Sequence, residues 1–186
     1  MSIKDNLLQI KSQLPENVTL VAVSKTKPVS DLMEAYNVGQ RIFGENKIQE
    51  MTEKWEQMPK DIQWHMIGHV QTNKVKYMAE YVSLIHGVDS LKLLQEINKQ
   101  AAKHNRIIDC LLQMYIAEEE TKFGLDEKEL EDILHFVQND KLQNIKVVGL
   151  MGMATFTDNQ TQIKKEFLNL KSTFDKINSL SIVNYQ

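Results

Sequence analysis

The sequence has 186 residues, of which 42% are hydrophobic and 25% charged, and its formal net charge is -3. This balance is typical of one globular domain with a sizeable core, expected here over residues 1–186. Lysines and arginines are scattered among acidic residues along the chain, which gives no electrostatic reason to bind DNA or RNA.

The chain carries no signal for a membrane or for an oxidising compartment. No run approaches the roughly 18 apolar residues of a membrane span, and residues 1–6 lack the apolar core of a signal peptide. We therefore expect a cytoplasmic protein without a membrane partner. The single cysteine, Cys110, lies in the apolar run 107–112, where a small buried side chain is the ordinary interpretation.

Six short apolar runs follow one another at even spacing and suit buried parallel strands. They cover residues 19–23, 41–43, 63–67, 82–86, 107–114 and 145–150. Apolar residues recur at helical spacings over 48–58, 130–137 and 163–177. Helix starts are predicted at Ser30, Thr72, Ser90 and the capping pair Asp126 and Glu129, and a helix stop at Gly39.

Strands that alternate with helices in this way require a parallel sheet with crossover helices. Both an open doubly wound sheet and a closed (β/α) barrel meet that requirement, and periodicity does not distinguish them. In either fold the loops after the strands converge on one face, where small molecules bind.

Lys25 directly follows the first predicted strand, so its side chain can project into the mouth of a barrel. Desolvation there would favour the neutral amine that a Schiff base requires. Position alone still favours a solvated surface lysine. Lys27 is a weaker candidate, because Pro28 turns the chain after it and leaves that side chain at the rim.

Other polar residues near strand ends have two interpretations each. Asn46 can hydrogen-bond a ligand hydroxyl or cap the following helix. His65 and His69 have the three-residue gap of zinc-binding helices, but His65 lies in a predicted strand and no Glu stands between them, so no metal site is expected. The run 118–122 is a solvated loop in its simplest interpretation, and no residue is marked as catalytic.

Six segments together resemble motifs of the YggS/PLPBP family of pyridoxal 5'-phosphate (PLP) homeostasis proteins, in order and spacing. They are 22–28 (AVSKTKP), 43–46 (FGEN), 64–68 (WHMIG), 71–74 (QTNK), 119–124 (EETKFG) and 149–153 (GLMGM). The resemblance runs from the first helix to about residue 180. It implies a TIM-type (β/α) barrel of PLP fold-type III, similar to the N-terminal domain of alanine racemase, with PLP as cofactor.

The resemblance also implies roles for individual residues. Lys25 would carry PLP as a Schiff base, Asn46 would lie near the ring, and Ile67 and Gly68 would form part of the pocket wall. Met151 would reach the pocket from the end of the sixth strand. The Lys122 side chain matches a family lysine linked to a secondary PLP site. The implied function is intracellular PLP (vitamin B6) homeostasis without catalytic turnover, with PLP-dependent apoenzymes as acceptors.

The resemblance breaks near residue 180. The family continues into strands that supply a phosphate loop and an arginine near the ring nitrogen, whereas here Leu180 and Ser181 would begin a seventh strand that is not continued. We therefore expect about six of the eight barrel strands and, if the chain ends here, weak or absent PLP retention. The alternatives are a PLP-dependent amino-acid racemase or decarboxylase, and a truncated barrel fragment that no longer retains PLP.

Overall fold

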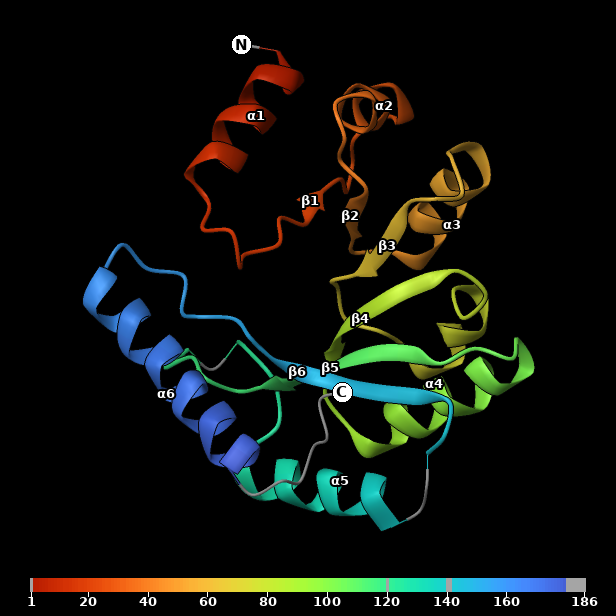
Figure 1. The fold of residues 1–186 in the computed structure, drawn as a ribbon. Helices are drawn as coiled ribbons and strands as arrows, with labels where there is room; N and C mark the ends of the chain where they lie inside the picture. Colours follow the sequence, from red (N-terminus) through yellow and green to blue (C-terminus); the bar gives the residue numbers. More distant parts are fainter. Residues whose placement is uncertain (1, 120, 140–141, 180–186) are drawn as a thin grey trace.

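The computed structural model describes residues 2–119, 121–139 and 142–179, and strands and helices alternate along it (Figure 1). All six predicted strands are confirmed. The elements are α1 Ile3–Gln13, β1 Ala22–Val23, α2 Val29–Asn37, β2 Ile42–Glu45, α3 Ile48–Gln57, β3 Gln63–Met66, the 3-10 helix η1 Thr72–Tyr77, β4 Val82–Val88, α4 Leu91–Lys103, β5 Ile108–Met114, α5 Glu127–Asn139, β6 Ile145–Gly152 and α6 Gln160–Ser179. The expected seventh strand at Leu180 lies outside the described residues.

The strand order resolves the choice that periodicity left open. The strands form one parallel sheet in the order β1-β2-β3-β4-β5-β6. A doubly wound sheet would reverse its order at a switch point and carry helices on both faces. Here each strand lies beside its predecessor, and the helices form an arc around the strands (Figure 1). The barrel class is thus confirmed, and the described residues hold six strands.

The core lies between the convex face of the sheet and the surrounding helices. In β5 the side chains of Ile108, Cys110 and Leu112 are fully buried, whereas the alternate residues Asp109 and Leu111 are only half-buried. This period of two follows from the pleat of a strand that has helices on one side. Burial also raises the pKa of the Cys110 thiol, which fits the expected inert, buried cysteine.

Several helix boundaries lie where the sequence predicts them. Ser90 Oγ accepts a hydrogen bond from the Leu93 amide (3.3 Å) at the start of α4. The capping pair before α5 is reciprocal, because the Glu129 amide donates to Asp126 Oδ1 (2.8 Å) and the Asp126 amide to Glu129 Oε2 (3.0 Å). Gly39, with φ of 95°, follows the end of α2.

Other boundaries differ from the prediction. Pro28, not Ser30, is the N-cap of α2, because its extended backbone leads straight into the helix at Val29. The segment after Gln71 is a 3-10 helix, not an α-helix. The first strand has only two residues, since β2 is its one neighbour in the described part of the chain. Within that part, no helix has the length and apolar character needed to cross a membrane.

Candidate functional site

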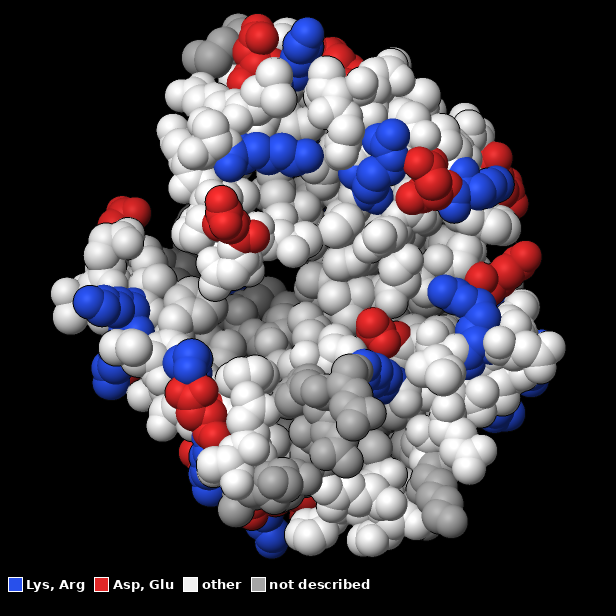
Figure 2. All heavy atoms as spheres, in the orientation of Figure 1, with Lys and Arg blue, Asp and Glu red and all other residues white. Residues whose placement is uncertain are grey.

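The carboxyl ends of the strands and the loops that follow them form the candidate site. Figure 2 shows a hollow left of the centre of this view, on the side where β4 and β6 end in Figure 1. Lysines, arginines and acidic residues are interspersed over the same face and form no extended patch of one sign (Figure 2). Such a surface offers no strong field for a polyanion.

Lys25 lies in the turn between β1 and α2, and its side chain is exposed. Within the described residues, its amine makes no hydrogen bond or ion pair. The prediction that the Lys25 amine is desolvated is therefore wrong for this structure. β1 is an edge strand with a neighbour on one side only, so Lys25 is open to solvent on the other side. What the turn presents instead is a free primary amine that a small molecule can reach.

The turn around Lys25 is tightly held although Lys25 itself is free. The Lys27 amide donates to the Ser24 carbonyl (3.1 Å) and the Thr26 amide to Glu50 Oε1 (2.6 Å). Thr26 has a φ of 63°, which a β-branched residue rarely adopts. Lys27 is exposed and lines a depression between α1, β1 and α2, and its predicted place at the rim of the barrel stays a prediction.

Three of the predicted pocket residues lie together at the ends of β2 and β3. A Cβ atom on Gly68 would stand only 2.5 Å from the Asn46 carbonyl oxygen, so the two backbones are in direct contact. Ile67 donates its amide to Glu45 O (2.9 Å), and its side chain packs over Gly44. The structure thus brings Asn46, Ile67 and Gly68 together, while their role as a pocket wall stays a prediction.

The helix-cap interpretation of Asn46 is wrong, because Lys47 is the N-cap of α3 and makes no side-chain capping bond. Asn46 instead lines a cavity of about 340 Å³ together with Met66, His69, Gln71 and Lys74. The ligand-binding interpretation of Asn46 stays a prediction, which its place at the edge of this cavity allows.

The loop after β5 reaches toward the same wall. Gln113 donates from Nε2 to the Phe123 carbonyl (2.9 Å), and the Phe123 ring meets the His69 ring edge-on with centroids 5.2 Å apart. Lys122 in this loop forms an ion pair with Glu119 at 3.7 Å. Met151 lies half-buried beside Gln113 in the register of β5 and β6.

The histidines pair differently from the sequence pattern. His65 Nδ1 lies 3.0 Å from His86 Nε2, while His69 pairs with Asp89 at 3.4 Å. Burial, and secondarily the neighbouring His86, lowers the pKa of His65 to about 4, and burial also lowers the pKa of His86. Both rings are therefore neutral at pH 7. The described residues contain no group of three or more side chains suited to a metal ion.

Glu166 on α6 joins the loops that follow β5 and β6. Its carboxylate accepts hydrogen bonds from the Thr155 amide (2.7 Å), the Thr155 hydroxyl (2.6 Å) and the Glu118 amide (3.1 Å). Burial tends to raise the pKa of Glu166, but these bonds and one from Gln162 outweigh it and lower the pKa to about 2. The Glu118 amide is thus anchored, so the start of this run is not the simple solvated loop expected from its composition.

Glu166→Gln is expected to lower the free energy of unfolding at pH 7 by about 2 kcal/mol, since it weakens charge-assisted hydrogen bonds to a buried group. The folded-state pKa lies below the ordinary 4.5, so this stabilisation is present above about pH 4.5 and is lost as the pH falls toward 2. Urea unfolding from pH 7 to pH 3 should show the two proteins converging. Asp175→Asn, at an exposed α6 carboxylate, is the control and should change little.

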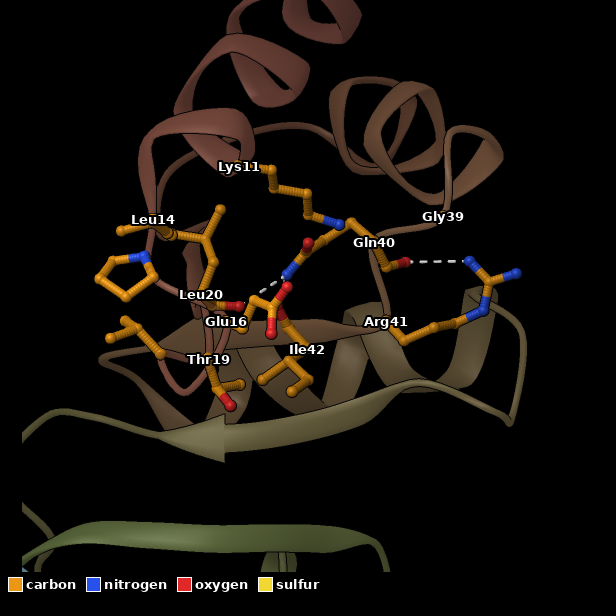
Figure 3. Close-up of a pocket in the computed structure, with 11 residues that line it drawn as sticks. Lys11, Leu14, Glu16, Thr19, Leu20, Gly39, Gln40, Arg41 and Ile42 are labelled. Atoms are coloured by element: carbon orange, nitrogen blue, oxygen red, sulfur yellow. Dashed lines mark hydrogen bonds between the residues drawn. The ribbon is translucent and has the colours of Figure 1, made fainter.

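A second cavity lies at the opposite ends of the strands and is not part of the site. It measures about 400 Å³ and is lined by residues that include Lys11, Gln40 and Arg41 (Figure 3). Gln40 links β2 to the segment before β1 there, donating from Nε2 to the carbonyls of Leu20 (3.0 Å) and Ile42 (2.6 Å). In barrels the amino ends of the strands serve stability, which is the role these bonds fulfil.

Comparisons with known proteins agree with this architecture. A family model described as alanine racemase, N-terminal domain, matches residues 1–184. PipY of Synechococcus elongatus PCC7942, solved with PLP bound, has a TM-score of 0.88 at 31% identity over 98% of this chain and 85% of its own. Alanine racemase of Clostridium difficile has a TM-score of 0.79 at 16% identity over 97% of this chain and 48% of its own, a likeness of fold alone.

The parallel barrel sheet, with its lysine after the first strand, therefore places the chain in the alanine racemase N-terminal domain class. Two curated relatives narrow this further, both called pyridoxal phosphate homeostasis protein. The Aquifex aeolicus protein is 37% identical over 85% of this chain and 69% of its own length. The Pasteurella multocida protein is 34% identical over 95% of this chain and 81% of its own length. The chain belongs to the pyridoxal phosphate homeostasis protein family.

Proposed function

We propose that this chain binds PLP as a Schiff base on Lys25 and serves intracellular PLP homeostasis. The observation that carries the proposal is the accessible amine of Lys25 at the carboxyl end of β1, which has no hydrogen-bond or ion-pair partner among the described residues. PLP supplies an aldehyde, which condenses reversibly with a primary amine and releases water. A residue that is free but fixed on a tightly held turn suits such a reversible covalent bond.

The neighbouring residues fit a flat aromatic ligand. Asn46 offers an amide that can donate to or accept from a ring hydroxyl. Ile67 is proposed to supply an apolar side chain to the pocket wall, and Gly68, by its close backbone contact with Asn46, to keep that residue in place. Met151 from the end of β6 is proposed to complete the pocket, and Lys122, paired with Glu119, to serve a secondary PLP site.

We favour a binding role over catalytic turnover. The relatives at 31–37% identity carry the name of homeostasis proteins, whereas the racemases in the comparison share only 14–17% of their residues with this chain. PLP-dependent apoenzymes are the proposed acceptors of the bound cofactor. The rival function is amino-acid racemisation or decarboxylation, and assays of optical rotation and of released carbon dioxide would detect either reaction.

The test is covalent trapping. The chain is incubated with PLP and reduced with borohydride, and the pyridoxyl group is located by peptide mass spectrometry. We expect one dominant adduct, on Lys25. Labelling spread over many lysines, or absent altogether, would refute the proposal and would favour a barrel fragment that does not retain PLP.

A further inference from the structure

A buried cluster of charged residues lies next to the Lys25 turn, and the proposed function does not use it. Lys54 on α3 donates from Nζ to Glu45 Oε1 and to Glu50 Oε1, each at 2.7 Å. The Glu45 side chain is fully buried and that of Lys54 is 6% exposed. We call these three residues the charged cluster.

The charged cluster makes hydrogen bonds to the backbone on both sides of Lys25. Before it, Lys54 Nζ donates to the Ser24 carbonyl (2.7 Å), and the Ser24 hydroxyl donates to Glu45 Oε1 (2.6 Å). After it, the Thr26 amide donates to Glu50 Oε1 (2.6 Å). The peptide groups that flank Lys25 are therefore fixed to β2 and α3, while its own side chain stays free.

Stability alone does not explain this arrangement. A buried ion pair roughly balances its desolvation cost, and apolar residues of similar size often serve as well or better. Within the described residues, Glu45 Oε2 is buried without any hydrogen-bond partner, which is a further cost. Thr26 adds the strain of its positive φ. These unfavourable features meet at the turn that carries Lys25.

We infer that the charged cluster positions Lys25 for PLP by holding the peptide groups on either side of it. Glu45, Glu50 and Lys54 are then positioning residues, and none of them needs to touch the cofactor. This inference rests on the proposed function. According to this inference, the hydrogen bonds of the residues next to Lys25 determine the direction in which its amine projects. Contacts of the Lys25 side chain itself do not.

Glu50→Ala is the sharpest test, because Glu50 is the most exposed member of the charged cluster and its loss leaves the Lys54–Glu45 bond in place. Glu53→Ala, at an exposed position of the same helix, is the matched control. Glu50→Gln keeps an oxygen that can accept from the Thr26 amide and should restore part of the wild-type behaviour.

We expect Glu50→Ala to raise the Kd for PLP roughly tenfold and to lower the share of borohydride-trapped adduct on Lys25 relative to Lys27. In the absence of PLP, hydrogen exchange at the Thr26 amide should become faster than in Glu53→Ala, since its acceptor is gone. Urea unfolding should show that both variants remain folded. Lys54→Met, which removes the donor to the Ser24 carbonyl, should shift the adduct share in the same direction.

A failure of the proposed function and a failure of the positioning inference give different results. A wild-type chain without a Lys25 adduct would refute the proposed function and, with it, the role of the charged cluster toward PLP. A wild-type chain that labels Lys25, together with Glu50→Ala equal to Glu53→Ala in adduct share and Thr26 exchange, would overturn the positioning inference alone.

Discussion

Lys25→Met should abolish the dominant pyridoxyl adduct after borohydride reduction, because methionine keeps the length of the side chain and removes its only nucleophile. Lys25 is exposed and the turn is held through its neighbours, so the free energy of unfolding should stay within about 0.5 kcal/mol of the wild type. Peptide mass spectrometry and urea unfolding on the same preparations measure both effects.

Lys27→Met is the matched control for this substitution. Lys27 is also exposed and lies two residues further along, but it lines a separate depression with Ile3 and Asp31. Its variant should retain the Lys25 adduct, as should Lys122→Met at the proposed secondary site. Loss of the adduct in Lys27→Met, with retention in Lys25→Met, would move the proposed Schiff base to the other lysine.

The sheet could be predicted well because its strands are buried on one face and flanked by apolar helices. The Cys110 and Trp64 side chains are fully buried, and the apolar runs that contain them were recognisable in the sequence. The choice between a barrel and a doubly wound sheet was not predictable from periodicity, since both give the same local pattern. Strand order is a property of the assembled sheet, and the resemblance, not the pattern, indicated it.

The surroundings of Lys25 were less predictable. Its position after β1 is local, but its exposure depends on what lies on the other side of that strand, which no local pattern states. The pairing of His65 with His86 was missed for a similar reason. Both lie on adjacent strands, β3 and β4, and only the register of those strands brings the rings together.

The position of Lys54 in the sequence could have predicted part of the charged cluster. Lys54 stands three residues after Met51 and four before Met58, within the apolar stripe of α3, and four residues after Glu50. A charged residue in a buried stripe needs a partner, and Glu50 one turn earlier is the first candidate. The second partner, Glu45, could be found only from the packing of α3 against β2.

Gly68→Ala is expected to lower the free energy of unfolding by about 2–3 kcal/mol and to weaken PLP binding. The added Cβ would lie 2.5 Å from the Asn46 carbonyl oxygen and 2.8 Å from its Cα, and neither is the end of a flexible side chain. The hydrogen bond from Ile67 to Glu45 holds this part of β3 against β2, so relief requires separating the two strand ends. Urea unfolding and borohydride trapping measure the two effects.

Gly39→Ala separates this steric effect from the conformational freedom of glycine. Gly39 has a positive φ but open space around its Cα, whereas Gly68 lacks a positive φ and is crowded. The Gly39 variant should lower the free energy of unfolding by only about 1 kcal/mol, through backbone strain. The amount of borohydride-trapped adduct on Lys25 should stay unchanged. If Gly68→Ala were no more damaging than Gly39→Ala, the ends of β2 and β3 would have to be able to move apart. Asn46 and Gly68 would then form a wall that adjusts to its ligand and not one built in advance.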